Sequence, residues 1–133
     1  MKNKKIVVAV VLAVFFAMPQ VVSALGSNMH GAYYGNYTSN VPGFSGDIEF
    51  MIDSDDSLTG TMTLRGADCD LDLALAMQSG NKEIFRGTLT RKADGFTTDI
   101  VITVSPHQAF DVAGRIILLR YGLVLGYTAE EVQ

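Results

Sequence analysis

The chain of 133 residues has one cysteine, Cys69, and no tryptophan. A single thiol cannot form an intramolecular disulfide, so hydrophobic packing has to stabilise the fold, although small exported domains often depend on disulfides. Cys69 alternates with apolar residues and lies between two aspartates. Burial and adjacent negative charge both disfavour the thiolate, so we predict a small core residue and not a nucleophile.

Cations are also scarce outside the N-terminus. The chain has ten Lys and Arg against fourteen Asp and Glu, and three of the lysines fall within Met1–Lys5. The rest of the chain therefore has seven basic residues against fourteen acidic ones, a formal charge of −7. Nucleic acids and anionic lipid surfaces are bound through clustered cations. The seven are scattered along the sequence, so we expect no nucleic-acid partner; they are Arg65, Lys82, Arg86, Arg91, Lys92, Arg115 and Arg120.

Residues 1–24 have the three parts of a secretory signal peptide. Met1–Lys5 is basic, Ile6–Met18 is an uninterrupted apolar run, and Val22-Ser23-Ala24 has small side chains where a signal peptidase cleaves. As a helix the apolar run is only about 20 Å long, short of the roughly 30 Å apolar core of a bilayer, which favours cleavage over an uncleaved anchor. We expect an exported protein, periplasmic or extracellular, whose mature chain spans residues 25–133.

Apolar residues recur at every second position in most of the mature chain, as in half-buried β-strands. The clearest run places five side chains on one side and three aspartates on the other: Cys69, Leu71, Leu73, Leu75 and Met77 against Asp68, Asp70 and Asp72. Gly, Pro, Asn and Asp separate the runs, which predicts one all-β domain, an antiparallel up-and-down meander. We expect strands near residues 31–38, 45–53, 58–65, 70–78, 83–91, 96–105, 109–119 and 121–127.

Eight short strands joined by tight turns favour a closed eight-stranded barrel, because closure removes the open edges through which exported sheets aggregate. A β-sandwich is the alternative fold. An outer-membrane barrel would need an apolar, lipid-facing row on every strand. The expected second to fifth strands each have a polar, charged row, so we expect no membrane insertion of the mature chain.

The last third of the chain is apolar on both sides of its strands, in the runs 100–104 and 115–127. Continuous apolar runs indicate burial on both faces. Either the N-terminal segment or the C-terminal tail covers the outer face, or these strands form a homodimer interface.

No motif for catalysis or metal binding emerges. The run Asp53–Ser57 resembles the start of a calcium loop, but the Gly and Glu that an EF-hand requires are absent. His30 and His107 lie far apart, and there is no Gly-x-Ser-x-Gly motif. We therefore expect no catalytic residue, no metal and no cofactor. A small barrel enzyme, an isomerase or cyclase acting on an apolar substrate, remains an alternative, and a buried Glu83 or Asp99 would support it.

The most distinctive stretch is His30 to Thr38, where glycines and tyrosines alternate. Together with Leu58-Thr59-Gly60-Thr61-Met62 it resembles the Gly-x-aromatic start of barrels in the lipocalin and avidin group, over about fifteen residues. The tryptophan of lipocalins is missing. The resemblance implies a barrel whose interior holds a small ligand. Seven aromatic residues either plug the interior or line a pocket: Tyr33, Tyr37, Phe44, Phe50, Phe85, Phe96 and Phe110. In the second case Tyr33, Tyr37, Phe50 and Phe85 are the candidate ligand-binding residues.

These features favour an exported binding or interaction module, with a small apolar ligand inside the barrel or a protein partner at its rim. The second version includes inhibition of a secreted enzyme, with the acidic turn Asp53 to Asp56 offered to a basic partner. A structural or adhesive envelope component is a third possibility.

Overall fold

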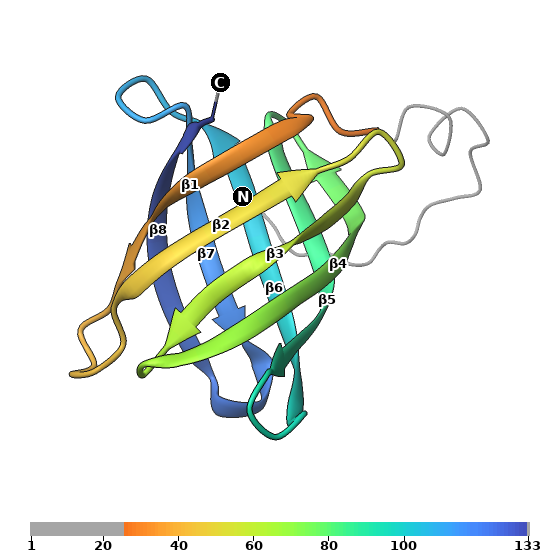
Figure 1. Cartoon of the computed structure of the whole chain (residues 1–133). Helices are drawn as coiled ribbons and strands as arrows, with labels where there is room; N and C mark the ends of the chain where they lie inside the picture. The colour runs from red at the N-terminus through yellow and green to blue at the C-terminus, as the bar shows by residue number, and fades with distance from the viewer. Residues whose placement is uncertain (1–25, 133) are drawn as a thin grey trace.

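The computed structural model describes residues 26–132, so the predicted signal peptide lies outside the described residues. These residues form eight antiparallel strands in one closed barrel, each paired with its neighbours in sequence and β1 also with β8 (Figure 1). The strands are β1 (Gly31–Thr38), β2 (Gly46–Ile52), β3 (Ser57–Leu64), β4 (Ala67–Ser79), β5 (Lys82–Arg91), β6 (Thr97–Pro106), β7 (Val112–Leu118) and β8 (Leu123–Glu131). The predicted barrel is confirmed, and the sandwich alternative is wrong.

The alternation in the sequence sets which side chains fill the barrel. Ile48, Phe50 and Ile52 of β2 are buried, and the residues between them are exposed. In β4, Cys69, Leu71 and Leu73 are buried in the same way, and the predicted row of aspartates is exposed. One contiguous core results, to which all eight strands contribute.

The pattern breaks at one place in β4. The pairing of β4 with β5 shifts between Leu75 and Met77, and this bulge reverses the side to which the following residues point. Met77, predicted to face inward, is 45% exposed. Gln78, predicted to face outward, is instead half-buried and contacts the N-terminal segment.

The end of the chain also differs from expectation. Leu119 and Tyr121, expected to be strand residues on either side of Arg120, form with it a short 3-10 turn, η2 (Leu119–Tyr121), which Gly122 ends in a left-handed conformation (φ 61°). The last strand starts later and continues to Glu131, because β8 has to reach the far end of β1, where Glu131 pairs with Tyr33.

An up-and-down barrel gathers alternate links at opposite ends. The links after β1, β3, β5 and β7 lie at one end, the lower end of Figure 1, which we call the open end. The links after β2, β4 and β6 lie at the other, which we call the closed end, together with residues 26–30. No helix within residues 26–132 is long and apolar enough to cross a membrane.

Candidate binding site at the open end of the barrel

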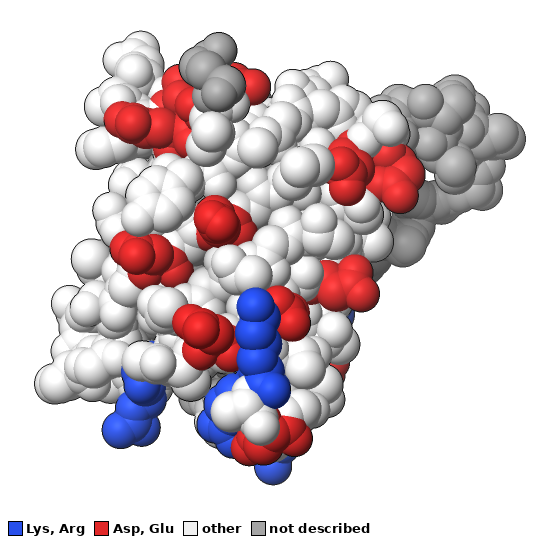
Figure 2. Space-filling model, in the orientation of Figure 1, with Lys and Arg blue, Asp and Glu red and all other residues white. Residues whose placement is uncertain are grey.

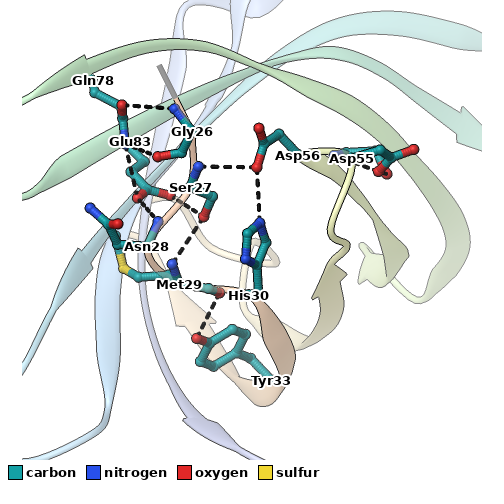
Figure 3. A network of polar contacts seen from close by, with 11 residues as sticks. Gly26, Ser27, Asn28, Met29, His30, Tyr33, Asp55, Asp56, Gln78 and Glu83 are labelled. Carbon is teal, nitrogen blue, oxygen red and sulfur yellow. Dashed lines mark hydrogen bonds and ion pairs between the residues drawn. The ribbon is translucent and has the colours of Figure 1, made fainter. Parts of the chain in front are cut away.

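Residues 26–30 seal the closed end through the buried carboxylate of Glu83 (Figure 3). The Ser27 hydroxyl donates to one oxygen of Glu83 at 2.6 Å, and the Asn28 amide donates to the other at 2.7 Å. Gln78 exchanges two hydrogen bonds with the backbone of Gly26. A buried carboxylate is tolerated only when it is hydrogen-bonded in this way.

The acidic turn between β2 and β3 completes the seal. Asp56 accepts a hydrogen bond from the Ser27 amide at 3.0 Å and lies 2.9 Å from Nε2 of His30. The hydrogen bond with His30 is the main reason that the pKa of Asp56 lies below its usual value. Asp55 instead accepts bonds from Ser57 within the turn. Two of the acids predicted to be offered to a basic partner are thus engaged within the chain.

Three of the four predicted ligand-binding aromatics pack or bond with other core groups. The Tyr33 and Phe50 rings stack with their centroids 5.3 Å apart, and Phe50 meets Tyr127 edge to face at 5.9 Å. The Tyr33 hydroxyl donates to the Met29 carbonyl, and that of Tyr37 donates to the Thr63 carbonyl. Burial raises the pKa of both phenols.

Phe85, the fourth candidate, is fully buried. None of the four lines the large cavity described next. The structure thus places all four among the packed core residues, as the plugging interpretation predicts.

A cavity of about 680 Å³ lies at the open end. This volume falls in the range of roughly 300–1,000 Å³ that is usual for small-molecule sites. Its walls come from the links after β1, β3, β5 and β7 and from the strand ends beside them. They are mainly apolar. The lining residues are Phe44, Leu64, Arg65, Ala67, Cys69, Leu89, Arg91, Phe96, Thr98, Leu118, Tyr121 and Leu123.

The apolar walls grade from buried to exposed. Cys69, Leu89 and Leu118 are at most 2% exposed, so they form the inner part of the cavity. Phe44 and Phe96 are half-buried and lie in the links after β1 and β5, at the mouth. An apolar molecule entering from the mouth would therefore meet mainly apolar surface.

Three arginines place their guanidinium groups over the aromatic rings at the mouth of the cavity. The Arg65 guanidinium lies 5.5 Å from the centre of the Phe44 ring. Arg91 and Arg120 lie 5.2 and 5.4 Å from the centre of the Phe96 ring. Such stacking holds a guanidinium in place while its N–H groups stay free for other partners.

The three arginines differ in their ion pairs. Arg91 forms a two-bonded pair with Asp94, at 3.0 and 2.7 Å, which lowers the pKa of Asp94 to about 2. Neither Arg65 nor Arg120 forms an ion pair with any of residues 26–132. Their charges are therefore available to an anion.

Arg65 occupies a backbone position that arginine disfavours. Leu64 pairs with Ala67, so Arg65 and Gly66 form a two-residue hairpin turn, and both have positive φ, 53° and 79°. Such turns prefer Asn, Asp or Gly at the first position. A left-handed conformation costs other L-residues roughly 1–2 kcal/mol, and the contact with the Phe44 ring, worth about 0.5–1 kcal/mol, offsets only part of it.

The cavity also has an unmatched polar group. Thr98, on β6 opposite Leu89, is 8% exposed, and its hydroxyl has no hydrogen-bond partner within residues 26–132. An unsatisfied buried hydroxyl costs about 1–3 kcal/mol. Cys69, nearby in the lining, is buried as predicted, and burial raises the pKa of its thiol.

The two ends of the barrel differ in charge (Figure 2). Four of the seven cations, scattered in sequence, come together at the open end, because each lies at the end of β3, β5 or β7 or in the link that follows: Arg65, Arg91, Lys92 and Arg120. In the view of Figure 2 most of the blue side chains lie towards this end, with some acidic ones among them, and acidic side chains are scattered over the rest of the face. Sequence reasoning missed this cluster, although the meander it predicted, with its alternate links at one end, was the signal that could have found it.

The groups considered for catalysis do not converge on this cavity. Glu83 is buried as proposed, but at the closed end, where the N-terminal segment binds both of its oxygens. Asp99, the other carboxylate predicted inside, is exposed on β6. Within residues 26–132 no three His, Cys, Asp or Glu side chains come together as a metal site would require.

The outer faces of β6 to β8 have only a short apolar row. Val101 pairs with Ile117, and Ile117 with Val124, so the three side chains lie side by side, and Val124 is 50% exposed. The inward residues between them account for the remaining apolar character of the runs. A homodimer through this row stays a prediction, which sedimentation velocity of wild-type and Val124→Asp protein can decide.

In comparisons with known proteins, no protein-family model, no curated protein and no solved structure matches this chain.

Proposed function

We propose that this protein is an exported binding protein that holds a small, mainly apolar molecule in the cavity at the open end. The observation that carries the proposal is the difference between the two ends of the barrel. The chain seals one end with its own residues 26–30 and leaves about 680 Å³ at the other. An exposed apolar cavity without a ligand is an unfavourable feature in a small domain, so its retention supports a binding role.

The cavity fits this role better than the four aromatic residues predicted from the sequence. Tyr33 and Phe50 contact each other, and Tyr33 also bonds Met29. Binding a ligand among them would require separating packed groups, which costs several kcal/mol per large side chain. The open-end cavity needs no such rearrangement.

Export is part of the proposal, because residues 1–24 are predicted to be a signal peptide. Gly26, two residues after the predicted cleavage point, is already hydrogen-bonded to Gln78, and Ser27 is buried against Glu83. Cleavage after Ala24 would leave both of these residues in the mature chain. The intact mass of protein from the exported fraction tests this, with a mature start at Leu25 as the expected result.

Native mass spectrometry of the same sample tests the binding role first, because a retained molecule would appear as added mass. For ligand-free protein, the absence of tryptophan allows a single fluorescent reporter. Phe96→Trp places it at the cavity mouth, and Tyr34→Trp, on the exposed face of β1, is the matched control. Decanol should change the emission of the Phe96→Trp protein and leave that of the control unchanged.

Cys69 offers an independent readout at the inner wall of the cavity. A saturating apolar ligand should slow its modification by a small thiol reagent. If neither decanol nor charged decyl compounds alter the reporter or Cys69 reactivity, the binding proposal is wrong.

A further inference from the structure

We propose that the ligand is a monomeric anionic amphiphile, a single alkyl or acyl chain with a carboxylate, phosphate or sulfate head. The inference rests on the proposed function and adds the head group. It follows from the arrangement of two kinds of surface in one cavity. Apolar walls lie inside, and guanidinium groups lie at the mouth.

The inner walls specify the tail. Cys69, Leu89 and Leu118 present no charge and are buried within the barrel. A head group that entered first would lose its hydration against these side chains, which is costly for an ion. The alkyl chain of the ligand therefore enters the cavity first, and the charged head group stays at the mouth.

The mouth specifies the sign of the head-group charge. Arg65 and Arg120 approach the mouth from different links, and neither is neutralised by a carboxylate of residues 26–132. Arg91 adds a third guanidinium, whose partner Asp94 occupies two of its N–H groups. A carboxylate or phosphate can accept charge-assisted hydrogen bonds from such groups, whereas a cationic head would be repelled.

Two further features agree with ligand binding at this end. Arg65 keeps its charge at a turn position that disfavours arginine. Thr98 leaves a buried hydroxyl without a partner beside the cavity. Both features cost stability in the empty protein, and strain of this kind is concentrated at binding sites.

The area around the mouth favours a single molecule over a membrane surface. Asp68 and Asp94 lie among the cations of the open end, and Asp70 lies 3.6 Å from Lys92. A lipid bilayer would have to approach these acids together with the arginines, whereas one head group can lie between the arginines alone.

The test compares three probes with the same decyl chain, each below its critical micelle concentration, by isothermal titration calorimetry. They are decanoate, decanol and decyltrimethylammonium. We expect decanoate to bind roughly three- to tenfold more tightly than decanol, as one or two partly exposed ion pairs allow, and the cation to bind most weakly. Affinity should rise about fourfold for each methylene from hexanoate to decanoate.

The decisive variant is the double substitution Arg65→Asn with Arg120→Gln, because asparagine is well suited to the left-handed turn position. It should abolish the preference for decanoate and leave decanol binding unchanged. The matched control is Arg86→Gln with Arg115→Gln, which removes the same charge from the outer faces of β5 and β7. Raising the salt concentration should weaken decanoate binding to wild type and to the control variant, and should leave decanol binding unchanged.

Equal affinities for all three probes, or an unchanged preference in the double variant, would overturn the head-group inference while leaving the binding role intact. Binding to vesicles containing anionic lipid without binding of monomeric decanoate would also overturn it, in favour of a lipid surface. Failure of every probe to bind would refute the proposed function itself.

Discussion

Replacing Thr98 by valine tests the claim that the cavity is built at the expense of stability. The two side chains have the same shape and are both β-branched, so the substitution changes a hydroxyl into a methyl group and little else. The Thr98 hydroxyl is buried and unpartnered within the described chain. Removing it should therefore stabilise the ligand-free protein, which is unusual for a buried position.

The expected change in the free energy of unfolding follows from the hydroxyl that is removed and the methyl group that replaces it. An unsatisfied buried polar group costs about 1–3 kcal/mol, and the new methyl group adds a favourable burial term of up to about 0.8 kcal/mol. Together the two contributions should raise the free energy of unfolding by about 1–4 kcal/mol. For a domain of this size, each kcal/mol corresponds to roughly 4–8 °C in the melting temperature.

Urea unfolding followed by circular dichroism measures this change, together with the thermal midpoint. The matched control is Thr88→Val, at an exposed position on the neighbouring strand β5, where the change should stay within about 0.5 kcal/mol. A Thr98→Val protein that is no more stable than wild type would show that the hydroxyl is already satisfied. The Thr98 hydroxyl would then no longer count as evidence for a ligand that bonds to it in the cavity.

Three other substitutions test the remaining parts of the structure. Glu83→Gln replaces an acceptor oxygen by a donor facing Ser27 or Asn28, so it should destabilise the fold by roughly 1–3 kcal/mol. Amide hydrogen exchange should become faster at residues 27–29, and unchanged protection would show that Glu83 does not hold this segment in place. Phe50→Leu should cost about 1–2 kcal/mol in urea unfolding yet leave decanoate affinity unchanged, whereas a large loss of affinity would return the site to the core aromatics. The pKa of Asp94, lowered to about 2 by its bond with Arg91, means that its contribution to stability is present above about pH 4 and lost as the pH falls from there towards 2. Asp94→Asn should therefore show a smaller loss of stability than wild type in urea unfolding over that range, and equal losses would contradict the ion pair.

The four aromatic residues show how far sequence patterns reach. Alternation identifies Tyr33, Tyr37, Phe50 and Phe85 as inward residues, and all four are buried. The same alternation cannot tell whether an inward side chain borders empty space or another side chain. That depends on which residues from other strands lie opposite, as Tyr127 of β8 lies against Phe50 of β2.

The bulge in β4 shows a second limit. The run from Cys69 to Met77 alternates without interruption, so nothing in it marks the shift after Leu75. The shift turns Gln78 towards Gly26 and Glu83, contacts separated by 52 and five residues in sequence. Only the closed end as a whole, with its incoming N-terminal segment, provides the partners that stabilise it.

The sequence by itself determined the antiparallel meander, because two-residue periodicity and tight turns are local properties, and it favoured closure into a barrel over a sandwich through the need to cover sheet edges. It also determined that Cys69 is a core residue and that the acids of β4 face solvent. The tertiary structure alone decided which end is sealed, where about 680 Å³ remains open, and that arginines distant in sequence stand together at its mouth. Each of these depends on closing the sheet, since closure brings alternate links to one end and places side chains from non-adjacent strands across a shared interior.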